Sequence, residues 1–142
     1  MTEADMQALR IAIVIDPDQP LGLLANTVAV LAAGLGAAAP ALGGRTLVDS
    51  TGRAFMNSAD RPIPVLQASA ETLSGLLGKS AGRPQGALVV PFPQLARTIH
   101  DFATYADVFA GRDLGSEPLL GIGVAGPDKW VRSLTGALKL LR

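Results

Sequence analysis

A run of nineteen residues, Leu21 to Ala39, contains only two polar side chains, those of Asn26 and Thr27. Since a membrane span needs roughly 20 mostly apolar residues, the run approaches the length of one. Its apolar character is weak, however: it holds seven alanines and three glycines, which add little transfer free energy, and no Lys or Arg cluster flanks it. We therefore expect a helix of a soluble protein, from Pro20 to about Gly36, and no membrane partner.

Strand patterns occur on both sides of this helix. Continuous apolar runs at residues 11–15, 86–92 and 118–123 predict strands that are buried on both faces. Residues 45–55 predict two short strands around a turn. From residue 63 the sequence predicts an edge strand, because of its prolines, and the tail from residue 137 is extended or a last strand.

Helix patterns alternate with these strands. Ser69 can cap one helix, a second is expected to begin after Pro93, and a third has Pro127 near its start and Gly136 at its end. Alternation of strands and helices over the whole length is typical of one α/β domain. We predict a single domain, residues 1–142, with a mixed, mostly parallel β-sheet flanked by helices.

The charged residues and the cysteine content exclude several classes of function. Twelve Lys and Arg balance twelve Asp and Glu, with no block of like charge, which makes nucleic acid or an anionic membrane an unlikely main partner. The chain has no cysteine, so it cannot form a disulfide or a thiolate site. The first ten residues lack the pattern of a secretory signal, and we expect a cytoplasmic protein.

Three glycines, Gly121, Gly123 and Gly126, match G-x-G-x-x-G between a predicted strand and a predicted helix. In dinucleotide-binding folds such glycines approach the pyrophosphate, and an acidic residue about 20 positions later holds the ribose. No such acid follows before Arg142, and Pro127 removes an amide donor that a phosphate would use. We therefore predict close packing of strand and helix at these glycines and no cofactor.

The helix after Pro20 has two different faces in projection. The core face carries Leu21, Leu24, Val28, Leu31 and Leu35. The other face consists of small residues around Asn26, namely Gly22, Ala29 and Ala33. Such a face admits a close backbone, a second subunit or a ligand, so Asn26 is either a binding group or an amide that pins the packing.

The helix expected after Pro93 has an apolar stripe formed by Leu95, Ile99, Phe102, Ala106 and Phe109. Thr98, Asp101 and Tyr105 lie on one flank of it, where polar groups can reach a cleft or form a hydrogen-bonded helix edge. His100, the single histidine, falls with Arg97 on the side away from the stripe, which predicts a solvated position.

Asp16 and Asp18 follow the first predicted strand, at the position where α/β folds often bind ligands. Two carboxylates there could hold a hard cation, but the neighbouring prolines fit an ordinary polar turn equally well. No His pair has metal-ligand spacing, so we expect no metal. The candidate ligand-binding residues are Asn26, Asp16, Thr98, Asp101 and Tyr105.

The segments "RIAIVIDPDQPLGLLANTVAVLA", "TIHDFATYA" and "LLGIGVAGPDKWVRSLTGALKLLR" together resemble an uncharacterised bacterial family, domain of unknown function 2000. The last segment also looks similar to the end of peptidyl-tRNA hydrolases of the second type. That resemblance implies an α/β fold with a mixed sheet flanked by helices, often as a dimer. Those hydrolases open the first helix with Gly-Lys, whereas Gly22 here precedes Leu23, so the resemblance implies the scaffold rather than the reaction.

Three functional hypotheses follow. The first is a small-ligand-binding or regulatory module with its site at Asn26 and Tyr105. The second is a hydrolase related to the peptidyl-tRNA enzymes. The third is a structural homodimer that uses the small-residue face of the first helix as its interface.

Overall fold

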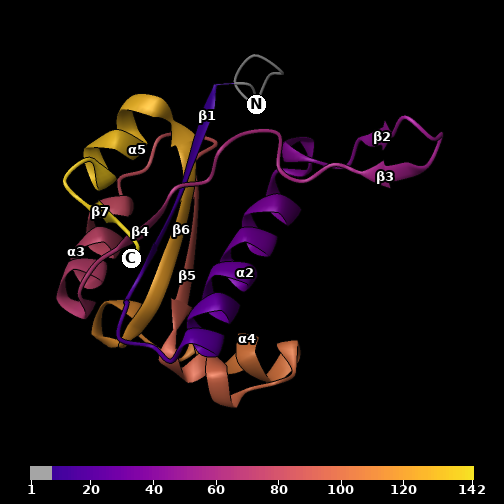
Figure 1. The fold of residues 1–142 in the computed structure, drawn as a ribbon. Coiled ribbons are helices and arrows are strands. Elements are labelled where there is room, and N and C mark those ends of the chain that lie inside the picture. The colour runs from indigo at the N-terminus through magenta and orange to yellow at the C-terminus, as the bar shows by residue number, and fades with distance from the viewer. Residues whose placement is uncertain (1–7) are drawn as a thin grey trace.

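Strand β1, Leu9–Ile15, runs through the middle of a five-stranded sheet with the order β5-β6-β1-β4-β7 (Figure 1). The structure is a computed structural model and describes residues 8–142. The start of the chain, where we expect no secretory signal, lies outside the described residues. Four α-helices accompany the sheet within residues 8–142, which confirms the mixed α/β class.

The pairing of the strands is mixed, as expected, but not mostly parallel. Strand β1 is parallel to β4, Val65–Gln67, and antiparallel to β6, Leu119–Pro127. The pairs of β5, Leu88–Pro93, with β6 and of β4 with β7, Lys139–Leu140, are also antiparallel. Parallel neighbours need a crossover, which α2 provides between β1 and β4, whereas the chain between β5 and β6 stays at one end of the sheet (Figure 1).

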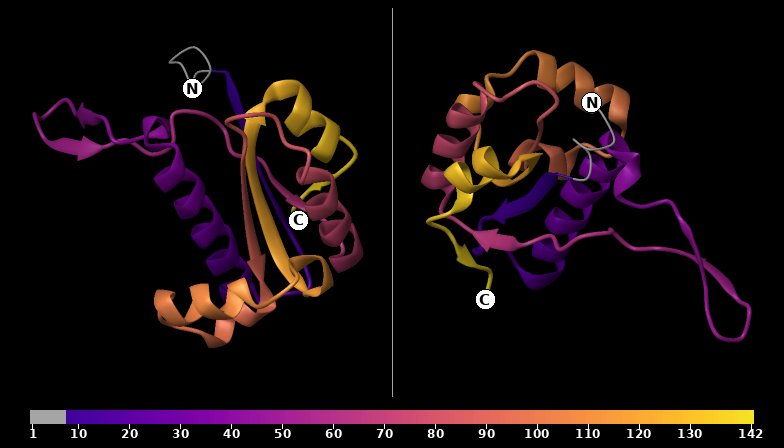
Figure 2. Two further views of the ribbon diagram at one scale, coloured as in Figure 1. Left: turned by 180° about the vertical axis from the view of Figure 1, so that it is seen from behind. Right: turned by 90° about the horizontal axis from the view of Figure 1, so that it is seen from above.

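Strand β1 is buried on both faces, as its continuous apolar sequence predicts. Ile11, Ile13 and Ile15 face helix α2, Leu21–Ala38, and belong to one core cluster with its leucines. The alternate residues, among them Val14, belong to a second cluster with helices α3, Ala70–Ser80, and α5, Asp128–Thr135. The sheet is therefore covered by α2 on one side and by α3 and α5 on the other (Figure 2).

Helix α2 is the helix expected after Pro20, and it packs on the sheet through Thr27, Leu31 and Leu35, which are buried. It is long and apolar enough to cross a membrane by length and composition, the one such helix in residues 8–142. The predicted core face is right except for Leu21, the first residue of the helix, which is 82% exposed. The opposite face, including Asn26, is exposed.

The glycines of β6 bring α2 close to the sheet, which confirms the packing interpretation of G-x-G-x-x-G. A Cβ atom at Gly121 would lie 2.9 Å from Leu31 Cδ1 and 3.0 Å from the Val14 carbonyl oxygen. A Cβ at Gly123 would lie 2.9 Å from Leu35 Cδ1. Pro127 ends β6 directly before α5, near the helix start as predicted, and Gly136 follows the last residue of that helix as predicted.

The prediction of a single amphipathic helix after Pro93 is wrong. A short 3-10 helix, η2, spans Gln94–Thr98, and α4 spans Phe102–Ala110. Between them Ile99 and Asp101 are extended, with φ and ψ of −118° and 116° and of −121° and 135°. The Asp101 side chain accepts hydrogen bonds from the amides that open α4, so it starts a new helix where the projection assumed a continuous one.

Two further strand predictions need correction. Strand β5 lies at the edge of the sheet and most of it is half-buried, although its sequence predicts burial on both faces. Strand β4 is not an edge strand, because β7 pairs with its outer side. Pro62 and Pro64 precede its paired residues and so do not interrupt the pairing. Ser69 caps α3 as expected: its hydroxyl accepts a hydrogen bond from the Thr72 amide at 3.2 Å.

The connection between α2 and β4 contains a hairpin that projects from the body of the molecule (Figures 1 and 2). The 3-10 helix η1, Pro40–Leu42, leads into strands β2, Thr46–Val48, and β3, Ala54–Met56, which pair in antiparallel fashion as predicted. The Asp49 carboxylate holds the turn through bonds from the backbone amides of Thr51, at 2.8 Å, and Arg53, at 3.1 Å. The hydroxyl of Thr51, together with these amides, lowers the pKa of Asp49 to about 2.

Candidate functional site

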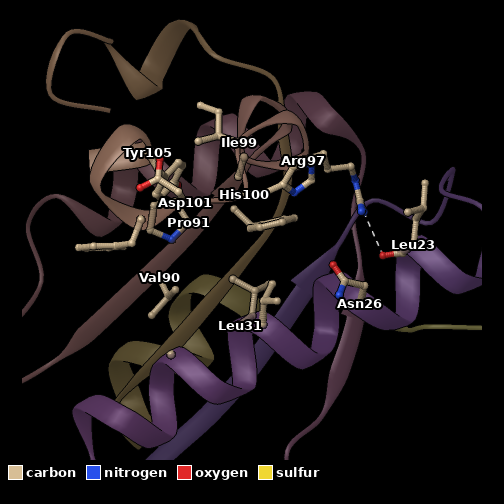
Figure 3. A pocket seen from close by; sticks show the side chains of 15 residues that line it. Leu23, Asn26, Leu31, Val90, Pro91, Arg97, Ile99, His100, Asp101 and Tyr105 are labelled. Atoms are coloured by element: carbon tan, nitrogen blue, oxygen red, sulfur yellow. Dashed lines mark hydrogen bonds between the residues drawn. The ribbon is translucent and has the colours of Figure 1, made fainter. Parts of the chain in front are cut away.

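A cleft of about 810 Å³ lies between the exposed face of α2 and the segment that runs from β5 through η2 into α4 (Figure 3). We call it the α2–α4 cleft. Its walls are mostly apolar, and they include Val30, Leu31, Val90, Pro91, Phe92 and Phe102. Five polar or charged side chains also line it: Asn26, Arg97, His100, Asp101 and Tyr105.

Three of the predicted site residues, Asn26, Asp101 and Tyr105, therefore lie around one cleft (Figure 3). The side chain of Asn26 is exposed and forms no hydrogen bond to any of residues 8–142, so it does not pin the packing of α2. His100 is exposed, which confirms the predicted solvated position, and it also borders the cleft. Whether these groups bind a ligand stays a prediction.

The other two predicted residues lie outside the cleft. The Thr98 hydroxyl donates a hydrogen bond to the Leu95 carbonyl at 3.1 Å and is exposed. The Asp16 carboxylate accepts a hydrogen bond from the Asp18 amide at 2.9 Å, which is the geometry of a polar turn. Within residues 8–142 no group of three or more His, Asp or Glu side chains could hold a metal ion.

Arg97 is the residue of the cleft that the sequence did not single out. Its Nη2 donates hydrogen bonds to Gln19 Oε1 at 2.6 Å, to Thr27 Oγ1 at 2.7 Å and to the Leu23 carbonyl at 2.9 Å. Its Cζ lies 5.6 Å from the centre of the Phe92 ring. These contacts join η2 to the first turns of α2, so Arg97 closes one end of the cleft.

The acceptors of Arg97 are themselves held in place. Thr27 is fully buried, and its hydroxyl donates to Gln19 Oε1 at 2.7 Å or to the Leu23 carbonyl at 3.0 Å. The Gln19 amide nitrogen donates to the carbonyls of Asp16, at 2.8 Å, and Leu120, at 3.1 Å. The only sequence signal of this network in α2 is the hydroxyl of Thr27 within an apolar run, and the sequence does not indicate its distant partner Arg97.

The carboxylate of Asp101 caps helix α4 and does not point freely into the cleft. Its carboxylate accepts hydrogen bonds from the Ala103 amide at 3.1 Å and from the Thr104 amide at 3.3 Å. The Thr104 side chain and these two amides lower the pKa of Asp101 below its ordinary value. A carboxylate at the start of a helix is stabilised in its charged form, because the first amides point toward it.

Tyr105 lies one turn into α4 and forms a wall of the cleft. Its ring meets the Phe109 ring edge-on, with centroids 5.7 Å apart and planes at 64°. Burial raises the pKa of the Tyr105 hydroxyl, so this group is a neutral hydrogen-bond donor or acceptor at ordinary pH.

A family model for the uncharacterised proteins described as "Protein of unknown function (DUF2000)" matches residues 9–142. The chain belongs to this DUF2000 family. Among solved structures, the DUF2000 chain is similar to a protein of unknown function from Agrobacterium tumefaciens strain C58, with a TM-score of 0.84 and 20% identity over 94% of this chain and 97% of that one. No curated protein matches it. The expected likeness to peptidyl-tRNA hydrolases stays a prediction for this DUF2000 chain.

Proposed function

We propose that this protein is a small-molecule-binding module and that its ligand occupies the α2–α4 cleft. The observation that carries the proposal is the lining of the cleft: mostly apolar walls with a few polar groups that point into it (Figure 3). Small-molecule sites have this composition and volumes of about 300–1,000 Å³, a range that includes this cleft.

The polar groups of the cleft are available to a ligand. The side chains of Asn26, His100 and Tyr105 form no hydrogen bond to residues 8–142. An amide, an imidazole and a phenol can each donate or accept, so they can orient a bound molecule without a prior partner to displace. Binding rather than catalysis is favoured, because the acid of the cleft, Asp101, is engaged by the first amides of α4.

The proposal is tested by a fragment screen followed in the two-dimensional NMR spectrum of the protein. We expect hits to shift the resonances of Asn26, His100 and Tyr105, and we expect Val30→Trp to weaken or abolish the shifts, because the added ring would project into the cleft. Val48→Trp makes the same substitution on the hairpin and should leave binding unchanged. A screen without any hit at the cleft, or hits that Val30→Trp does not affect, would refute the proposal.

Self-association is a second candidate function, and the exposed apolar side chains favour it. The hairpin presents Leu47, Val48, Phe55 and Met56, each at least 58% exposed, and the outer face of α2 presents Leu23 at 45%. Contiguous exposed apolar surface is typical of interaction sites. Sedimentation should show a homodimer that Phe55→Ser or Leu23→Ser weakens, and a monomer at all accessible concentrations would exclude it.

A further inference from the structure

We propose that the ligand of the α2–α4 cleft is an organic carboxylate, with its acidic group on Arg97 and an apolar body along the cleft. This inference rests on the proposed function, because it names the chemistry of the molecule that the cleft would take. It starts from the position of Arg97, a half-buried cation at the end of a mostly apolar cleft.

Arg97 differs from the other arginines in its charge environment. Among residues 8–142, six arginines form ion pairs with Asp or Glu side chains: Arg10, Arg45, Arg53, Arg61, Arg112 and Arg132. Two more, Arg83 and Arg142, are exposed to solvent. Arg97 is half-buried, and no carboxylate in the described part of the chain forms an ion pair with it. A partly desolvated cation of this kind gains free energy when an anion binds next to it.

The acid nearest in the lining does not supply that anion. Asp101 directs its carboxylate at the amides of Ala103 and Thr104, and it forms no ion pair with Arg97. The groups that do contact Arg97, the Gln19 and Leu23 oxygens and the Thr27 hydroxyl, are neutral. They fix the guanidinium in place without neutralising its charge.

The bonds that fix Arg97 leave part of its donor edge open. All three protein acceptors contact Nη2, whereas Nε and Nη1 form no hydrogen bond to residues 8–142. The Phe92 ring lies beside the guanidinium, with 5.6 Å between its centre and Cζ, and restricts it further. The free N–H groups of Nε and Nη1 lie on different edges of the guanidinium, so each can donate one charge-assisted hydrogen bond to an anionic oxygen. The mostly apolar lining of the cleft is the reason to prefer an organic carboxylate to an inorganic anion.

The surroundings of Arg97 fit a ligand with an acidic end and an apolar body. Asn26 lies near this end of the cleft and can donate a further hydrogen bond to the acid (Figure 3). From there the cleft continues along α2 past Leu31 toward Val90 (Figure 3). Gly34, which carries no side chain, is also part of the lining. A Cβ at Gly34 would lie 3.3 Å from Val90 Cγ1, so the helix passes close to β5 and the apolar body would lie over this contact.

The test compares two probes of the same size and shape, 4-phenylbutanoate and its neutral amide, 4-phenylbutanamide. Both are titrated into the full chain, and binding is followed through NMR resonances of the cleft, including the Arg97 Nε–H. We expect the carboxylate to bind about tenfold or more tightly than the amide, because only the carboxylate forms a charge-assisted bond. The difference should shrink as salt is added, because the pair is only partly buried.

Two variants separate the role of Arg97 from its packing. Arg97→Met keeps the length of the side chain without the charge, so the two probes should bind it equally. Arg83→Met removes the charge of an exposed arginine outside the cleft, and the preference for the carboxylate should persist. If Arg97→Met fails to fold, the unaltered protein still locates the acid, because the carboxylate should shift the Arg97 Nε–H resonance and the amide should not.

The outcomes distinguish this inference from the proposed function. Equal binding of both probes at the cleft would overturn the carboxylate inference and leave small-molecule binding intact. Persistence of the preference in Arg97→Met would also overturn it, because the acid would then be recognised elsewhere. Absence of any shift at the cleft with either probe would count against both proposals.

Discussion

At the scale of the residue, the distance between helix α2 and strand β6 depends on Gly121. We expect Gly121→Ala to lower the free energy of unfolding by about 1–3 kcal/mol, because the added methyl would lie 2.9 Å from Leu31 Cδ1 and 3.0 Å from a backbone oxygen of β1. The side chain of Leu31 can shift, but the Val14 carbonyl is held in the sheet. Chemical denaturation measures the change.

Gly75→Ala is the matched control for this substitution. Gly75 lies inside helix α3, and a Cβ there would meet nothing within 4 Å, so alanine should raise the free energy of unfolding by about 0.5–1 kcal/mol. A Gly121→Ala protein as stable as the parent would show that α2 moves away from the sheet without cost, and the close packing would then be incidental.

At the scale of the element, helix α4 depends on the charge of Asp101. Asp101→Ala should speed hydrogen exchange at the amides of Ala103 and Thr104, because the carboxylate is their acceptor. Lowering the pH should reduce the protection of these amides relative to their intrinsic exchange rates at each pH. The folded-state pKa of Asp101 is lowered, so its contribution is complete above the ordinary pKa near 3.8 and disappears as the pH falls through the folded value.

Asp107→Ala is the control on the same helix, since Asp107 forms no side-chain hydrogen bond among residues 8–142. Amide exchange in the first turn of α4 should be unchanged in this variant. Equal rates in Asp101→Ala and in the parent protein would contradict the capping role.

The same segment shows where sequence patterns are sufficient and where they are not. β1 could be predicted because its residues are apolar on both faces, and α2 because its apolar residues repeat at helical spacing. The stripe from Leu95 to Phe109 also has helical spacing, but spacing does not reveal the break, which depends on one side chain that binds the backbone after it. The edge position of β5 depends on tertiary pairing and could not be predicted from its apolar sequence.

The site was predictable in part for the same reason. The sequence indicates Asn26 as the polar group of a small-residue helix face and Tyr105 as a polar group beside an apolar stripe, and both line one cleft. The helical projection places Arg97 on a solvated face, because a projection contains only neighbouring residues. The hydrogen bonds of Arg97 reach residues that are 70 to 78 positions away in the sequence. Contacts over such separations are set by the packing of α2 and η2, which no local pattern encodes.

At the scale of the whole molecule, acid should destabilise the fold through carboxylates that are paired only in the folded state. Hydrogen bonds from Arg61 and Arg45 lower the pKa of Asp60 to about 2, and the bonds from Arg132 and Arg10 lower that of Asp128. Both groups stabilise the fold above pH 3.8. The contribution of Asp60 decreases between pH 3.8 and about 2, and that of Asp128 is lost as the pH falls through its lowered pKa. The melting temperature should fall over that interval.

Asp60→Asn tests whether the charge of Asp60 contributes to the acid sensitivity, because the asparagine amide is neutral at every pH. Its melting temperature should be lower than that of the parent at neutral pH, and the difference should narrow in acid. Asp107→Asn, at a carboxylate that forms no ion pair in the described part of the chain, is the control. A difference that stays constant down to pH 2 would contradict the role of the Asp60 charge.

The projecting hairpin has a consequence for how this chain can change in evolution. Its two strands leave and rejoin the body at neighbouring points. There the backbone N–H of Asn57 donates a hydrogen bond to the Arg45 carbonyl at 2.9 Å, and the backbone N–H of Arg45 donates one to Asn57 Oδ1 at 2.8 Å. Insertions or deletions beyond that junction alter neither the register of β1 with β4 nor the position of α2. The hairpin is thus a place where relatives can diverge in length and surface chemistry while the sheet and the cleft are preserved.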